Sequence, residues 1–186
     1  RGRKYVASSF LTPQGPDYSK GLQCFAETAP LTREGMYWLA VHGANCFGED
    51  KVSFDNRNGW VEENTDKIIQ TATNPYEYKW WQDADSPWQF LAFCFEWKEI
   101  QSKLSKNLKL GDINSRIPVS LDGSNNGLQH LSAIARDRVG AISTNLVPSE
   151  TPNDIYQDVA NEVIKVLETR KSHDEMARQW LEFGIN

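Results

Sequence analysis

The sequence has few cysteines, no long apolar run and no internal repeat, and these absences exclude several classes of protein. Its three cysteines, Cys24, Cys46 and Cys94, lie far apart and form no Cys-x-x-Cys pair, which disfavours a disulfide framework or a cysteine-ligated zinc site. No hydrophobic stretch is long enough to span a bilayer, and no signal-peptide pattern is present. We therefore expect a soluble protein in a reducing compartment, with no membrane as a partner.

The length and apolar content allow one ordinary domain with its own core. The chain has 186 residues, of which 39% are hydrophobic. It begins at Arg1 rather than at a methionine, and it stops just after a helical pattern. We therefore expect an internal fragment of a longer protein.

The net charge of −5 is concentrated in one stretch. Residues 49–85 hold nine acidic and four basic residues, which accounts for the whole net charge, so the remainder is neutral. Residues 98–116 carry five basic residues against two acidic ones, and we assign them no role. Because nucleic-acid phosphates attract positive charge, we expect the acidic stretch to face away from any nucleic acid.

Three short apolar segments predict strands, over residues 5–10, 22–26 and 117–121. The first two are separated by the turn-rich segment 12–17, which would allow them to pair antiparallel. We expect all three strands to lie in one sheet.

Helix signals dominate after Pro30. The predicted first turns are capped by Thr32, by Ser53 or Asp55, by Ser86, by Asn125 or Asn126, by Thr151-Pro-Asn-Asp154 and by Ser172-His-Asp-Glu175. The strongest signal is Ser86-Pro-Trp-Gln89, where Ser and Gln can form a capping box and Pro occupies the first helical position. That helix should reach about Lys103, and Asn74-Pro75 should end an earlier one.

Seven tryptophans are many for this length and admit two interpretations. They could stack on nucleic-acid bases, or they could pack a helical layer against a sheet. The residues concerned are Trp80, Trp81, Trp88, Phe90, Phe95 and Trp97. They surround a capped helix, so we favour packing, and we expect Cys94 among them to act as a small buried hydrophobe.

Asp122 ends the apolar run of Ile117, Val119 and Leu121, and helical periodicity begins after it. A carboxylate at the end of a strand, beside Gly123 and Ser124, can bind a divalent cation with help from the Gly123 carbonyl. Magnesium favours such oxygen ligands. An Asp-Gly pair after a strand is also a common turn whose acid faces water, and the spacing alone leaves both interpretations open.

Residues 122–130, Asp-Gly-Ser-x-x-Gly-x-Gln-His, followed by Arg136-Asp137, resemble motif A of the single-subunit DNA-dependent RNA polymerases of T-odd bacteriophages and mitochondria. The phage branch fits best. Other segments resemble these enzymes in the same order along the chain. They are Arg1-Gly-Arg3 with Pro13-Gln-Gly15, His42-Gly-Ala-Asn-Cys46, Asp85-Ser-Pro87 with Phe90-Leu-Ala-Phe-Cys-Phe-Glu96, and Leu146-Val-Pro-Ser-Glu-Thr151.

The resemblance implies a helix-rich α+β fold that forms part of a right-hand polymerase. Residues 1–29 would hold the first palm strands, and residues 30–112 a helical palm insertion. Residues 113–139 would supply the motif A strand and helix, and residues 140–186 the start of the fingers.

The resemblance also implies a two-metal mechanism of nucleotidyl transfer, with two Mg²⁺ ions roughly 3.5 to 4 Å apart. Asp122 would be the catalytic metal ligand, assisted by the Gly123 carbonyl. In the family the second metal-binding aspartate and the triphosphate-binding Lys and Arg come far downstream, beyond Asn186. We therefore expect the 186 residues alone to be inactive.

Other residues acquire expected roles from the same resemblance. Related DNA polymerases place a glutamate near Gly127 that excludes the ribose 2′ hydroxyl, so Gly127, with Ser124 nearby, predicts ribonucleotide use; alternatively, Gly127 only eases the first helical turn. Arg3 would contact the template or the RNA–DNA hybrid. Gln129 and His130 would support the metal ligands without contacting the metal themselves.

The implied partners are a DNA template and promoter, nascent RNA and ribonucleoside triphosphates, in a monomeric enzyme in the cytoplasm of a bacterial host. The resemblance therefore implies template-directed synthesis of RNA. Two alternatives remain: a DNA polymerase of related architecture, and a non-catalytic helical interaction module in which Asp122 merely ends a strand.

Overall fold

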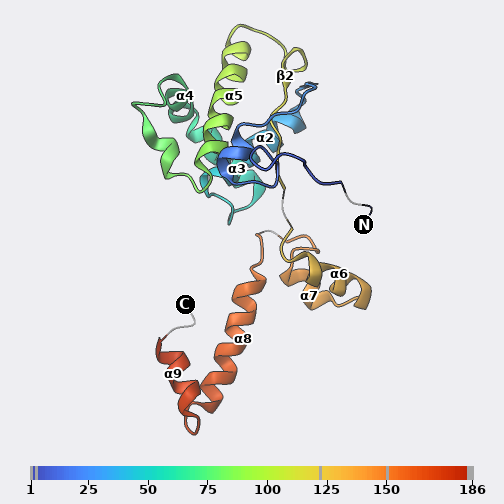
Figure 1. Ribbon diagram of the computed structural model, residues 1–186, viewed down its shortest axis with the longest axis vertical. Helices are drawn as coiled ribbons and strands as arrows, with labels where there is room; N and C mark the ends of the chain where they lie inside the picture. Colours follow the sequence, from blue (N-terminus) through green and yellow to red (C-terminus); the bar gives the residue numbers. More distant parts are fainter. Residues whose placement is uncertain (1, 3, 122, 150, 184–186) are drawn as a thin grey trace. The chain divides into compact units, whose positions relative to one another are not determined.

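The computed structural model describes residues 2, 4–121, 123–149 and 151–183, which form two compact units divided between residues 121 and 122 (Figure 1). Helices dominate both units, as the sequence predicted. The helices of the first unit are α1 (Asp17–Gly21), α2 (Arg33–Phe47), α3 (Phe54–Glu63), α4 (Thr65–Thr73) and α5 (Pro87–Ser105), with 3₁₀ turns η1 (Lys79–Asp83) and η2 (Leu110–Asp112). Those of the second are α6 (Asn126–Ala135), α7 (Arg138–Ser143), α8 (Ile155–Arg170) and α9 (Glu175–Phe183).

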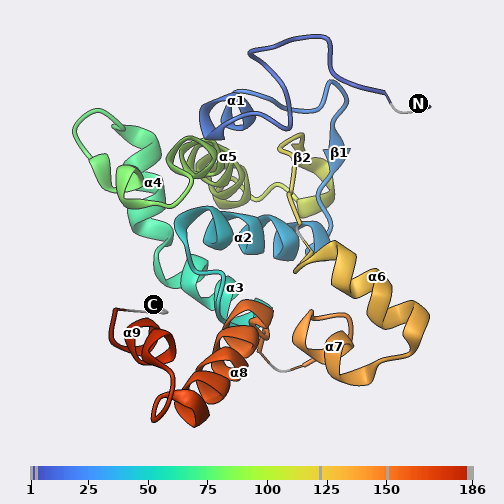
Figure 2. The ribbon, with the colours of Figure 1, turned by 60° about the horizontal axis from the view of Figure 1, so that its bottom comes forward.

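The core of the first unit lies where α2, α4 and α5 meet. Helix α2 packs against both α3 and α5, and Figure 2 shows it between them. Phe90 and Phe93 of α5 are fully buried, and the ring of Phe93 fills the space beside Gly43 of α2, where a Cβ would lie 2.3 Å from it. Only glycine allows the two helices to approach this closely.

The aromatic residues mostly serve this core. The rings of Phe47, Trp60, Trp80 and Phe90 form a cluster with neighbouring centroids 4.8 to 6.4 Å apart. Trp81, Cys94 and Trp97 are also buried, which confirms core packing for them. Trp88 and Phe95 are about half exposed, so the prediction is wrong for these two.

The predicted three-stranded sheet is wrong. The sheet among the described residues consists of β1 (Ala29–Pro30) and β2 (Asn114–Ser115), paired antiparallel with Ala29 opposite Ser115. Residues 5–10, 22–26 and 117–121 have no strand structure. A strand is stabilised by hydrogen bonds to a neighbouring strand, and a sequence that alternates apolar and polar residues does not by itself supply that neighbour. The side chains of Tyr5 and Phe10 are largely exposed, so they do not form the buried face expected of such a strand.

The predicted helix boundaries are mostly confirmed, and the caps explain them. Thr32 Oγ1 accepts a hydrogen bond from the Gly35 amide at 2.9 Å, Ser53 caps α3, and α4 ends before Asn74. The single helix expected between Ser53 and Asn74 is wrong, because the chain forms two helices there, α3 and α4, which meet at Asn64. Helix α8 begins as expected, but its capping side chain is Asp154 rather than Thr151.

Helix α5 begins at Pro87 as predicted, yet the capping box is wrong. Ser86 makes no side-chain cap. Instead the carboxylate of Asp17 accepts hydrogen bonds from the Trp88 amide at 2.7 Å, the Gln89 amide at 3.1 Å and Gln89 Nε2 at 3.0 Å. A charged side chain from α1 therefore satisfies the free amides that a local serine was expected to satisfy.

No helix in the part of the chain that the structure describes is long and apolar enough to cross a membrane.

Candidate active site

Two of the predicted site residues, Asp122 and Arg3, lie outside the described residues. The others, Gly123, Ser124, Gly127, Gln129 and His130, lie at the start of α6 in the second unit. The described geometry therefore concerns the residues that follow the predicted metal ligand.

The turn before α6 is held in an unusual backbone conformation. Asn125 has φ of 56° and ψ of 71°, in the left-handed region that asparagine tolerates better than most residues. Its side-chain Oδ1 accepts a hydrogen bond from the Leu128 amide at 3.3 Å, and its carbonyl accepts one from the Gln129 amide. This confirms Asn125 as the N-cap and fixes where the loop stops and the helix begins.

Side-chain oxygens gather beside Gly123. A Cβ added at Gly123 would lie 2.7 Å from Asn126 Oδ1 and 3.3 Å from Gln129 Oε1, so a larger residue would require these two side chains to move. Gln129 Nε2 donates a hydrogen bond of 2.7 Å to the Thr144 carbonyl. Because only the amide nitrogen can donate, the Gln129 oxygen is left to face Gly123.

This surrounding fits a hard divalent cation. The donors near Gly123 are neutral oxygens, and the adjacent Asp122 would add a carboxylate, which is the ligand chemistry that Mg²⁺ prefers. The described residues contain no cluster of three or more His, Cys, Asp or Glu side chains. Metal ligands from this segment would therefore be amide or carbonyl oxygens together with the single carboxylate of Asp122.

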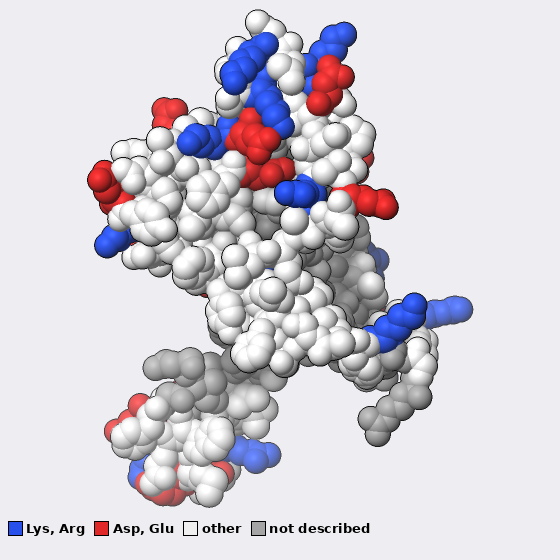
Figure 3. Space-filling model, turned by 45° about the horizontal axis from the view of Figure 1, so that its top comes forward, with Lys and Arg blue, Asp and Glu red and all other residues white. Residues whose placement is uncertain are grey.

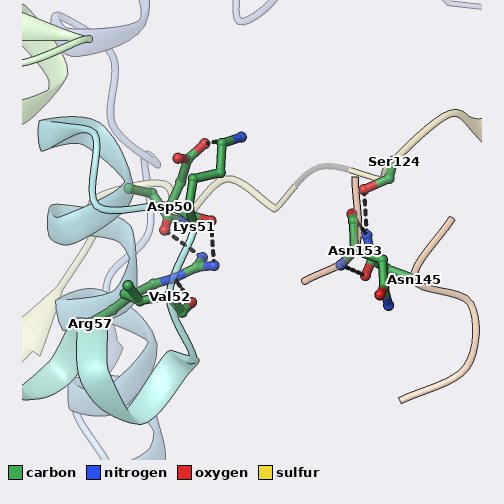
Figure 4. Close-up of polar contacts among 8 residues, drawn as sticks. Asp50, Lys51, Val52, Arg57, Ser124, Asn145 and Asn153 are labelled. Atoms are coloured by element: carbon green, nitrogen blue, oxygen red, sulfur yellow. Dashed lines mark hydrogen bonds and ion pairs between the residues drawn. The ribbon is translucent and has the colours of Figure 1, made fainter. Parts of the chain in front are cut away.

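A second set of hydrogen bonds ties Ser124 to the segment after α7 (Figure 4). Asn145 Nδ2 donates to Ser124 Oγ at 3.0 Å and to the Asn153 carbonyl at 2.9 Å. The Asn153 amide donates to Asn145 Oδ1 at 2.7 Å. One amide side chain therefore links the loop after Asp122 to the start of α8.

Gly127 and His130 differ from their neighbours in having open surroundings. A Cβ at Gly127 would meet no atom within 4 Å, and its backbone is helical. His130 is exposed. A larger side chain at Gly127 can therefore be accommodated without a clash among the described residues.

The segment that leads to Asp122 is attached to α2 by His42. The Ser120 amide donates to His42 Nδ1 at 3.5 Å, so His42 contacts the backbone of this segment. Burial lowers the pKa of His42 to about 4, so the imidazole is neutral. Its neighbour Cys46, with Sγ 3.6 Å from His42 Nε2, has its pKa raised to about 12 by burial and then by the Asp17 carboxylate, so it is an inert thiol.

Charges of both signs are mixed on the face of the molecule that Figure 3 shows, where Lys and Arg are interleaved with Asp and Glu. Within the basic stretch, Lys103 pairs with Glu99 and Lys98 reaches the Ala72 carbonyl. Arg57 of α3 is buried. Its guanidinium donates hydrogen bonds to the carbonyls of Asp50 and Val52, which attach the loop before α3 to that helix (Figure 4).

Sequence reasoning missed Asn145 and Asn153, which do not belong to the motif A pattern. A signal for Asn145 existed, because an asparagine just beyond a short helix is well suited to a left-handed position, and Asn145 has φ of 59°. Its link to Ser124, 21 positions earlier, had no local signal.

Comparisons with known proteins identify the family to which the chain belongs. The family model for DNA-dependent RNA polymerase matches residues 29–186. The chain belongs to this family, which confirms the predicted resemblance.

The chain is similar to relatives from phages and from mitochondria. It is 48% identical to T7 RNA polymerase of Escherichia phage T7 over 169 residues, which is 90% of the chain and 18% of the relative. It is 40% identical to the DNA-directed RNA polymerase of Enterobacteria phage K11 over 210 aligned positions, covering 100% of the chain and 22% of the relative. It is also 40% identical to the mitochondrial DNA-directed RNA polymerase of Neurospora crassa, covering 94% of the chain and 12% of that protein. The chain thus spans about a fifth or less of these relatives.

Proposed function

We propose that the full-length protein containing this chain is a DNA-directed RNA polymerase that adds ribonucleotides to an RNA 3′ end on a DNA template. The observation that carries this proposal is the Asp122-Gly-Ser motif within a region that belongs to the family. Support comes from the oxygen surround of Gly123 and from the capped start of α6.

The chain would supply one part of the right-hand architecture. Residues 1–29 would belong to the palm, residues 30–112 to a helical palm insertion, residues 113–139 to motif A, and residues 140–186 to the start of the fingers. The rest of the palm, with a second metal-binding aspartate, would come from sequence beyond this chain.

The family implies a divalent metal, and here Asp122 with the Gly123 carbonyl would hold it. When bound, Mg²⁺ activates the attacking 3′ hydroxyl and neutralises charge on the triphosphate. The chain's own contribution is positional: Asn125 fixes the turn, and Gln129 keeps an oxygen facing Gly123. Gly127 would leave space for the ribose 2′ hydroxyl. His130 would support the metal ligands without contacting the metal.

The proposed partners are those of a single-subunit transcription enzyme. A DNA template and promoter, the nascent RNA and ribonucleoside triphosphates would bind the complete protein, which would act as a monomer. Arg3 would contact a phosphate of the template or hybrid. The similarity to enzymes of bacteriophages supports the cytoplasm of a bacterial host as the location.

The decisive experiment replaces the proposed metal ligand. We expect Asp122→Asn in the full-length protein to lower promoter-directed RNA synthesis by at least about a thousandfold, because an uncharged amide cannot replace a metal-binding carboxylate. The measurement is incorporation of labelled ribonucleotide, with template binding as the control that the variant is folded. Undiminished synthesis with Asp122→Asn would exclude Asp122 from the active site.

A further inference from the structure

We propose that Asn145 is a positioning residue for the metal site, acting through Ser124. This inference rests on the proposed function, because it assumes that Asp122 binds the catalytic metal. It adds a residue outside motif A whose side chain would determine how the loop after Asp122 is held.

The first argument is the place of the contact. Ser124 is two residues after Asp122, and its hydroxyl accepts a hydrogen bond of 3.0 Å from Asn145 Nδ2. The side chains of Asn126 and Gln129 crowd Gly123 from the helix, at 2.7 and 3.3 Å from a Cβ position. The loop is therefore linked to α6 through the Asn125 cap and to the segment after α7 through Asn145.

The second argument is that Asn145 is itself held rigidly. Its Oδ1 accepts from the Asn153 amide at 2.7 Å, and its Nδ2 donates to the Asn153 carbonyl at 2.9 Å. Both amide hydrogens and the carbonyl oxygen of the side chain are thus used. Because the side chain cannot rotate without breaking two bonds to backbone, its contact with Ser124 has a fixed direction.

The third argument is that Gln129 makes a parallel connection. Its Nε2 donates to the carbonyl of Thr144, the residue immediately before Asn145. The short segment 144–145 therefore contacts motif A twice, once in α6 at Gln129 and once in the preceding loop at Ser124. Two contacts at adjacent residues restrict the loop more than either alone, since each limits the motion that the other permits.

Residues that orient metal ligands without touching the metal commonly change metal affinity or activity by one to two orders of magnitude when replaced. Asn145 has this relation to the site. It would fix the loop from which Asp122 and the Gly123 carbonyl reach the ion.

The test uses the full-length polymerase and two variants that cut the link at opposite ends. Asn145→Gly removes the amide while tolerating the left-handed φ of 59° at this position, and Ser124→Ala removes the hydroxyl alone. The measurement is the free Mg²⁺ concentration that gives half-maximal RNA synthesis at saturating nucleotide. We expect Asn145→Gly to raise it on the order of tenfold, Ser124→Ala to raise it nearly as much, and the double variant to add little more.

Asn153→Ala is the matched control. Its side chain donates to the Ile142 carbonyl and to Ser149 Oγ, both at 3.1 Å, but to no residue that the structure describes in the motif A loop. We expect this variant to melt at a lower temperature with an unchanged Mg²⁺ requirement. A purely structural role for Asn145 would give the same pattern, with stability lowered and the Mg²⁺ requirement unmoved, and that result would overturn the proposal.

The outcome is distinguishable from failure of the proposed function. If Asp122→Asn abolishes synthesis while Asn145→Gly leaves the Mg²⁺ requirement unchanged, only the role of Asn145 is wrong. If Asp122→Asn retains full synthesis, the metal site itself is misplaced and the positioning role falls with it.

Discussion

At the scale of single residues, Gly127 is the position at which we propose that the enzyme distinguishes ribose from deoxyribose. The position lies in the first turn of α6, and no atom among the described residues would obstruct a Cβ there. No described side chain packs against this position, so the packing of α6 does not require a glycine there. We propose that the open space is used by the ribose of the incoming nucleotide.

We predict that Gly127→Glu in the full-length enzyme lowers the preference for ribonucleotides over deoxyribonucleotides by at least about tenfold, because the carboxylate would crowd the 2′ hydroxyl. The measurement is the ratio of kcat/KM for the two sugars. Gly127→Ala is the control, since it should stabilise α6 by about 0.5 to 1 kcal/mol and disturb the sugar choice less. Undiminished ribonucleotide preference with the glutamate would leave Gly127 with only a helical role.

His42 makes the first unit sensitive to acid. Its pKa is lowered by burial to about 4, from an ordinary value near 6.5 in the unfolded chain. Between these values the unfolded chain binds a proton that the folded chain does not, so the free energy of unfolding falls as the pH falls from about 6.5 to about 4. Protonation would also remove the acceptor for the Ser120 amide.

We expect His42 to contribute a slope of at most about 1.4 kcal/mol per pH unit in this window. The measurement is urea unfolding at a series of pH values for the parent and for His42→Gln, whose side chain does not titrate. The difference between the two slopes isolates His42 from the many carboxylates that titrate in the same range. Identical slopes would show that the imidazole is accessible to protons in the folded state.

At the scale of elements, helices were predictable and strands were not. Thr32, Ser53 and Asn125 cap their own helices through contacts three residues apart, so a local pattern contains the whole signal. Ile117 and Leu121 alternate like a strand, but whether they pair depends on which segment lies beside them. Among the described residues, no strand pairs with residues 117–121.

The capping of α5 marks the limit of local prediction most clearly. Ser86-Pro87 correctly located the first turn, but the acceptor for its amides is Asp17, 71 and 72 positions away from the residues that it caps. The same limit applied to the candidate site. Asp122, Gly123 and Gln129 were recognisable as a motif, whereas Asn145 is joined to it by folding alone.

We predict that Asp17→Ala lowers the free energy of unfolding by about 1 to 2 kcal/mol, because three donors at the start of α5 lose a charged acceptor. The measurement is denaturant or thermal unfolding followed by circular dichroism. The matched control is Asp66→Ala, which removes an exposed aspartate from the first turn of α4. A loss no larger than that of the control would mean that water replaces the Asp17 carboxylate without cost.

At the scale of the whole molecule, the chain is one part of a longer family member. The family model covers residues 29–186, while the chain spans 18% of the T7 relative and 22% of the K11 relative. Under the proposed function, two-metal transfer would require carboxylates from more than one segment, of which Asp122 would be one.

We therefore predict that the 186 residues alone synthesise no RNA on a DNA template at any Mg²⁺ concentration. The measurement is a primer-extension assay with labelled ribonucleotides, and the full-length enzyme serves as the positive control. Template-directed extension by the isolated chain would show that a complete metal site exists within it.

The carboxylate of Asp17 also has a consequence for the order of events in folding. The first turn of α5 has no serine cap of its own, and α1 approaches it so closely that a Cβ at Gly21 would lie 2.7 Å from the Trp88 carbonyl oxygen. The beginning of this long helix can reach its native stability only after the two segments have met, and closing that loop carries an entropic cost. During synthesis on the ribosome, residues 17–21 would emerge first and remain without their partner until the start of α5 follows.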